Sequence, residues 1–144
     1  MFRIFSAALL LVCSAWSSQA DDLVLHDYQG SWEDARFSVE NAIVDQGLVI
    51  DYVSHVGEML ERTKEDVGSD VTLFDQADIF VFCSAKVSRE VMEANPLNIA
   101  FCPYGIFVSE REGLVQIGYR SYPDGAMKKV QALLEEIVQE ALSF

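Results

Sequence analysis

The stretch ADIFVFCSAKVSREVMEANPLNIAFCPYGIFVSE, residues 77–110, decides the fold of this chain. Residues 79–83 are all apolar or cysteine, which predicts a buried strand. The following residues, 86–94, predict a short helix that ends at Asn95-Pro96, because the position before a proline disfavours helical backbone. A strand therefore leads directly into a helix.

A second apolar run, residues 99–108, predicts a long strand. Pro103 interrupts this run, and proline cannot donate a backbone hydrogen bond to a neighbouring strand. We therefore expect this strand to lie at an edge of the sheet or to carry a bulge near Cys102. The turn at residues 110–113 leads into residues 114–121, which predict the second strand of a hairpin.

The N-terminal half also mixes strands and helices. Residues 23–28 alternate between apolar and polar side chains, which predicts a strand. Residues 48–54 also predict a strand, with Leu48, Ile50 and Tyr52 on one side and Val49, Asp51 and Val53 on the other. Between them, Ser31 is suited to cap a helix whose apolar positions follow the helical period until Gly47 ends it. Residues 57–66 predict a weaker, charged helix.

The clearest helical pattern lies in the C-terminal residues 124–142. Their apolar side chains fall on one stripe, as expected for a helix packed on a core. The predicted order is then β-α-β-(α)-β-α-β-β-α. Because helices and strands do not alternate regularly, we predict an α+β fold: a single domain over residues 21–144, with a mostly antiparallel sheet and helices packed on one face.

The first twenty residues have the pattern of a secretory signal peptide. Arg3 supplies a positive charge, residues 4–12 are apolar, and small residues precede a cleavage site after Ala20. The apolar run is shorter than the roughly 20 residues that a membrane-spanning helix needs. We therefore expect a periplasmic or secreted protein with no membrane span. Lipidation of Cys13 is the alternative.

Removal of this segment leaves 144 − 20 = 124 residues, the size of one ordinary domain. Arg3 leaves with it, so 10 − 1 = 9 basic and 23 acidic residues give a net charge of −14. The basic residues form no cluster, which argues against nucleic acid and anionic lipid as partners. The sequence also has no calcium-loop motif and no glycine-rich phosphate loop.

Cys83 and Cys102 are the only cysteines left after removal of the predicted signal peptide. They lie 102 − 83 = 19 positions apart, in a chain predicted to enter a compartment where disulfides persist. A structural disulfide between them would contribute ~3 kcal/mol in the chain-entropy model. Two buried free thiols, or a reactive or metal-binding pair, are the alternatives. The spacing is not that of a thioredoxin-like redox pair or a zinc knuckle.

Further polar residues could join the cysteines in a ligand pocket. The candidates are Ser88, Arg89, Tyr104 and Arg120, because arginines near a thiol can hold a small anion or lower the pKa of the thiol. Glu93 follows Arg89 by four residues, which is the spacing of an ion pair on a helix. No catalytic residue is assigned, since two histidines without a Gly-x-Ser-x-Gly motif do not indicate a catalytic triad.

His55 and Met59 are the candidates for metal ligands. If the backbone is helical there, they share one face, and together with a thiolate they could bind copper or the iron of haem. The competing interpretation is a histidine with a local hydrogen bond and a methionine that fills the core. We therefore assign no cofactor and keep copper and haem as alternatives.

Several motifs resemble one known family when they are taken together. They are Phe82-Cys83-Ser84, Ser88-Arg89, Asn95-Pro96, the segment from Ile99 to Ile106, and Gly118-Tyr119-Arg120. This pattern is similar to exported members of the DUF302 family, which are small α+β domains of unknown function, and it covers residues 31–142. The resemblance implies the fold and admits a homodimer, but it implies no reaction.

Three classes of function are consistent with these observations. We favour an exported binding or interaction module for a small ligand or a protein partner, because the chain has no recognisable catalytic spacing. The first alternative is a thiol-based redox, soft-metal or haem-binding protein that uses Cys83 and Cys102. The second is a structural homodimer.

Overall fold

The computed structural model describes residues 22–144, so the predicted signal peptide and Cys13 lie outside the described residues. Nine regular elements and one short 3-10 helix follow the predicted order. They are β1 (Leu23–Asp27), α1 (Trp32–Asp45), β2 (Val49–Ser54), α2 (Val56–Thr63), β3 (Gln76–Cys83), α3 (Ala85–Ala94), the 3-10 helix η1 (Pro96–Phe101), β4 (Tyr104–Arg111), β5 (Leu114–Arg120) and α4 (Lys128–Ala141).

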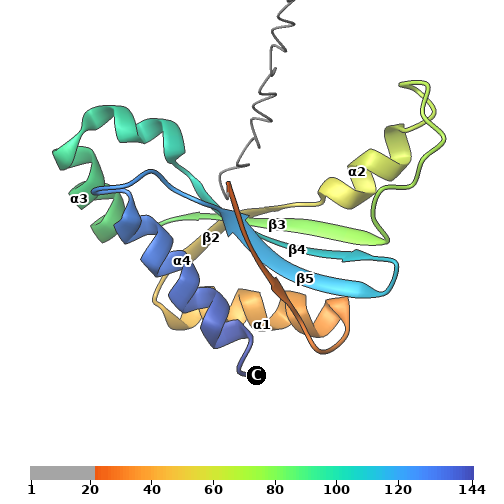
Figure 1. Ribbon diagram of the computed structural model, residues 1–144, viewed down its shortest axis with the longest axis horizontal. Helices are drawn as coiled ribbons and strands as arrows, with labels where there is room; N and C mark the ends of the chain where they lie inside the picture. The colour runs from red at the N-terminus through yellow and green to blue at the C-terminus, as the bar shows by residue number, and fades with distance from the viewer. Residues whose placement is uncertain (1–21) are drawn as a thin grey trace, which may run out of the picture.

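The strands form one antiparallel sheet in the order β1-β5-β4-β3-β2 (Figure 1). The three strands from the C-terminal half lie next to one another in the middle of the sheet. The two strands from the N-terminal half, β1 and β2, lie at opposite edges. The predicted α+β class and the antiparallel sheet are therefore confirmed.

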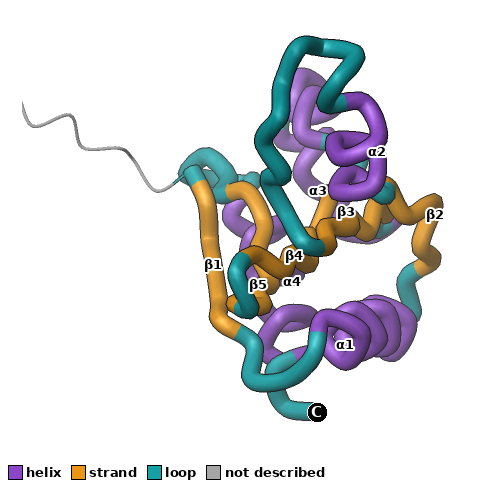
Figure 2. Tube along the Cα trace, turned by 90° about the vertical axis from the view of Figure 1, so that its right-hand side faces the viewer, coloured by secondary structure: helices purple, strands orange, loops and turns teal. Residues whose placement is uncertain are grey.

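Helices α1 and α4 pack together against one face of the sheet, below it in Figure 1. Helix α1 begins where predicted, because the side chain of Ser31 accepts a hydrogen bond from the backbone N–H of Asp34. The apolar stripe of α4 is fully buried in the core, at Val130, Leu134, Ile137, Val138 and Ala141. The remaining helices lie at two ends of the sheet: α2 at one end, and α3 with η1 at the other (Figure 1). Figure 2 shows α2 and α3 on the side of the sheet opposite α1.

The prediction of a strand over residues 99–108 is wrong in its first half. Pro96 stands in the first turn of η1, and the side chain of Asn95 accepts a hydrogen bond from Leu97 N at its start, so this segment winds into a 3-10 helix. The strand begins only after Pro103. It is consequently β4, which lies between two partners rather than at an edge, and proline does not interrupt its ladder.

The other face of the sheet carries an unusually close contact between two central strands. A Cβ atom on Gly118 would stand 2.5 Å from Cζ of Phe107 and 2.7 Å from the backbone oxygen of Val24. The Phe107 ring therefore lies over Gly118 from the neighbouring strand, and only glycine fits beneath it.

Within residues 22–144, none of the helices is long and apolar enough to cross a membrane.

Candidate functional site

The structure brings the two cysteines together. Cys83 is the last residue of β3 and Cys102 directly follows η1, and their sulfur atoms are 3.1 Å apart. Both are free thiols here; Cys83 is exposed and Cys102 is half-buried. The peptide bond between Cys102 and Pro103 is cis.

The local sequence explains why the chain returns to Cys83 after leaving β3. Ser84 caps α3 by accepting a hydrogen bond from the backbone N–H of Val87, so the helix starts at once after the strand. Beyond α3, the side-chain amide of Asn98 donates a hydrogen bond to the backbone oxygen of Val91. This bond folds η1 back onto α3 and leads the chain to Cys102.

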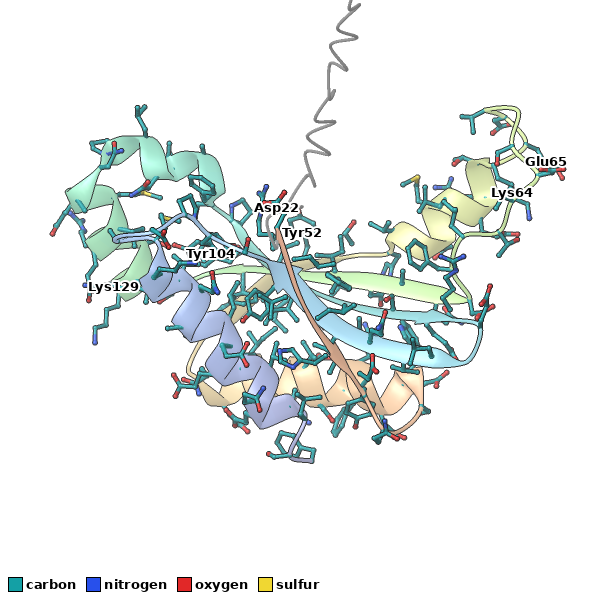
Figure 3. All side chains as sticks on the ribbon, viewed as in Figure 1. Asp22, Tyr52, Lys64, Glu65, Tyr104 and Lys129 are labelled. Carbon is teal, nitrogen blue, oxygen red and sulfur yellow. The ribbon has the colours of Figure 1, made fainter. Side chains whose placement is uncertain are left out.

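Two predicted pocket residues adjoin the cysteines. The hydroxyl groups of Ser88 and Tyr104 are 2.9 Å apart, and the Ser88 hydroxyl is 3.9 Å from the sulfur of Cys102. Figure 3 places Tyr104 at the end of the sheet near α3. Burial raises the pKa of Tyr104, although its hydrogen bond with Ser88 acts in the opposite direction. We call Cys83, Cys102, Ser88 and Tyr104 the dithiol cluster.

The surroundings of Cys83 keep its thiol protonated. Burial raises its pKa from the ordinary 9.0 to about 11, and the hydrogen bond with Cys102 and the charges of Cys102 and Asp51 act in the same direction. A thiolate is the nucleophilic form of cysteine. At neutral pH, Cys83 is therefore a poor nucleophile, unlike the cysteines of thiol–disulfide oxidoreductases whose pKa is lowered.

The two predicted arginines lie outside the dithiol cluster. Arg89 is 76% exposed at its side chain and forms an ion pair with Glu93, at 3.6 Å, as the spacing predicted. Arg120 lines a separate hollow of about 520 Å³. Neither arginine has a described hydrogen bond or ion pair with a cysteine.

Tyr122 connects that hollow to the dithiol cluster, and sequence reasoning missed it. Its ring packs edge-on against Tyr104, with 6.2 Å between the ring centres, and burial raises its pKa to about 12. The hydroxyl group of Tyr122 is buried without a hydrogen-bond partner among residues 22–144. A second buried tyrosine therefore packs against the dithiol cluster through Tyr104.

The structure separates His55 from the cysteines. His55 stands just before α2, and its Nδ1 is 2.7 Å from Oδ1 of Asp78. Asp78 and Cys83 lie 83 − 78 = 5 residues apart on β3, or about 17 Å at roughly 3.3 Å per residue. Met59 is on α2 and is 40% exposed. The described part of the chain contains no group of three or more His, Cys, Asp or Glu side chains that could hold a metal ion.

Asp78 is the centre of a second cluster that the sequence did not predict. Its carboxylate is nearly inaccessible to solvent, and it accepts hydrogen bonds from Nε of Arg36 at 2.9 Å and from Nδ1 of His55 at 2.7 Å. We call these three residues the Asp78 cluster. Its members are 42 and 23 positions from Asp78 in the sequence, so no local motif could reveal it.

Comparisons with known proteins agree with the fold. The chain is similar to an uncharacterised conserved DUF302 protein from Bacillus stearothermophilus, whose crystal structure superposes with a TM-score of 0.67 at 20% identity. The match covers 86% of this chain and 98% of the other, and at this identity it shows the fold alone. No curated protein is similar to this sequence. The model of the domain of unknown function DUF302 matches residues 25–143, and the chain therefore belongs to the DUF302 family.

Proposed function

We propose that this chain is an exported binding module whose site is the dithiol cluster, and that its ligand is a soft, thiol-seeking cation of the Cu(I) type. One observation carries the proposal: two free thiols are 3.1 Å apart, and one of them is open to solvent. Thiolates are the protein ligands that soft cations prefer. Two neighbouring sulfur atoms can hold such an ion without any further residue of the chain.

The electrostatic surroundings support a cation rather than an anion. Burial is the largest cause of the raised pKa of Cys83, and the negative charge of Asp51 adds to it. That negative charge would stabilise a bound cation. The acidic surface of the chain acts in the same direction by attracting cations. Because the cation must displace protons from the thiols, its affinity should rise with pH.

The test is a titration of the reduced protein with Cu(I) in competition with a chromogenic chelator. We expect one equivalent of Cu(I) per chain, and loss of binding in both Cys83→Ser and Cys102→Ser. Arg89→Ala is the matched control, since Arg89 lies nearby and outside the cluster. Equal Cu(I) retention by the wild type and by the double cysteine variant would refute the proposal.

A reversible disulfide is the second candidate, and the same distance between sulfur atoms favours it. In an oxidising compartment such a pair could close by losing two electrons and two protons to an oxidant such as a partner disulfide. Thiol titration of denatured, unreduced protein from the native host decides the matter. No free thiol identifies the disulfide, whereas two free thiols and bound copper identify the cation site.

Export is part of the proposal and rests on residues 1–20. Intact-mass measurement of the protein from its native host should find Asp21 at the N-terminus. Retention of Met1 would contradict export. A lipid on Cys13 would indicate a form that is anchored to a membrane. The homodimer admitted by the family resemblance stays a prediction, to be checked by light scattering.

A further inference from the structure

A pocket beside His55 lies at the other end of β3 from the dithiol cluster. It has a volume of about 400 Å³ and is formed where the first turn of α1, the start of α2 and the first residues of β3 meet. This volume suits a small organic molecule. Its lining includes Trp32, Glu33, Arg36, His55, Glu58 and Ala77.

The Asp78 cluster fixes how His55 faces this pocket. A carboxylate oxygen only accepts hydrogen bonds, so the short contact with Oδ1 of Asp78 requires the proton of His55 to be on Nδ1. In the neutral ring, Nε2 then carries a lone pair and is a hydrogen-bond acceptor. The His55 side chain is 57% exposed, so a ligand in the pocket can reach it.

The guanidinium group of Arg36 is partly engaged by carboxylates of the chain itself. Nε of Arg36 is engaged by Asp78, and Nη1 of Arg36 is 3.7 Å from Glu40. The indole N–H of Trp32 is buried and has no hydrogen-bond partner among residues 22–144. By contrast, Glu33 and Glu58 are exposed and form no ion pair with the described residues. The exposed charged groups that line the pocket are therefore carboxylates, which accept hydrogen bonds, and the amide of Gln76 lies beside them.

The charge of the pocket also favours a cation. The carboxylates of Glu33, Glu58 and Asp78 against the guanidinium of Arg36 give 1 − 3 = −2. The N-termini of α1 and α2 each add roughly half a positive charge. Together they reduce the total to about −1, so the pocket remains negative.

We propose that this pocket binds a small organic cation, a primary amine with an apolar body, whose ammonium group donates hydrogen bonds to Nε2 of His55 and to the carboxylates of Glu33 and Glu58. The apolar body lies against the ring of Trp32 and the methyl group of Ala77. This site is independent of the dithiol cluster. Asp78 positions His55, and the ligand need not touch Asp78 itself.

The mature protein offers a direct reporter for this pocket. The sequence has two tryptophans, and Trp16 belongs to the predicted signal peptide, so fluorescence of the mature chain reports on Trp32 alone. We would titrate the mature Cys83→Ser/Cys102→Ser protein with benzylamine, and with benzyl alcohol and benzoate as neutral and anionic analogues. Fluorescence and the NMR shifts of the His55 ring would be followed together. A saturable change is expected for benzylamine only.

Two sets of variants test the named contacts. Glu33→Gln/Glu58→Gln should weaken benzylamine binding by about ten-fold, because it removes two exposed charge interactions, and His55→Gln should also weaken it. Glu112→Gln/Glu136→Gln removes the same charge from exposed positions elsewhere and should leave binding unchanged. A preference for benzoate, no saturable benzylamine signal by either method, or equal affinity in both double variants would overturn the proposal.

Discussion

The thiol of Cys83 should react more slowly than an ordinary cysteine, because its pKa is raised from 9.0 to about 11. At about pH 8 this shift reduces the thiolate fraction from about a tenth to about a thousandth, which is about 100-fold. A thiolate of higher pKa is also a better nucleophile, with a Brønsted coefficient of about 0.4–0.5. This gain offsets about half of the loss on a logarithmic scale, so we expect alkylation about ten-fold slower than in the unfolded chain.

The assay is timed alkylation of the reduced protein with iodoacetamide, followed by mass spectrometry of the peptide that contains Cys83. The same protein in urea gives the rate of an ordinary thiol. Cys102→Ala should accelerate alkylation of Cys83, since it removes a hydrogen bond and a charge that raise the pKa, and Asp51→Asn should act in the same direction with a smaller effect. Equal rates in the folded and unfolded chains would refute the electrostatic reasoning.

Three further predictions concern stability, each measured by urea unfolding. Because the pKa of Cys83 is raised in the folded state, its protonated thiol contributes fully to the free energy of unfolding below about pH 9, and this contribution is lost as the pH rises through about 11. Free energies of unfolding that stay constant over this range would contradict the pKa shift. Leu134→Ala should lower the free energy of unfolding by about 2–5 kcal/mol, since Leu134 is fully buried. Glu136→Ala, at an exposed position on the same helix, should have almost no effect. Similar values for the two variants would mean that the apolar stripe of α4 does not face the core. Gly118→Ala should lower the free energy of unfolding by about 1–3 kcal/mol through its contact with Phe107. Adding Phe107→Ala should restore only part of this loss, because the contact with a backbone oxygen remains. An unchanged free energy of unfolding in Gly118→Ala would disprove the close approach.

The sequence predicted those elements whose signals are local. The cap at Ser31 and the apolar stripe of α4 depend on neighbouring residues, and both are confirmed. The fully apolar run predicts a strand that begins at residue 79, whereas β3 begins at Gln76 and includes Asp78. In the structure Asp78 faces the core side, and Arg36 neutralises it from a distant helix. A compensating partner so far along the chain cannot be read from a local pattern.

The same limit applies to the candidate site. The apolar run and the two cysteines made this segment the candidate site, and the structure places Cys83, Cys102, Ser88 and Tyr104 together. The run from residue 99 nevertheless predicts a strand, because apolar content alone does not distinguish a short helical segment from a strand. Only the position of Pro96 in the first turn distinguishes them. The sequence could not reveal the pocket beside His55, because residues from three separate elements form it.

The strand order also determines when this chain can fold. A ribosome or an export channel delivers β1, α1 and β2 first, yet β1 pairs only with β5 and β2 only with β3. The early half of the chain therefore has no strand partner until the late half has emerged. Pairing between such distant segments is slow, because the intervening chain must lose entropy before the contacts form. The sheet therefore cannot be completed until β5, its last strand in the sequence, is available to pair with β1.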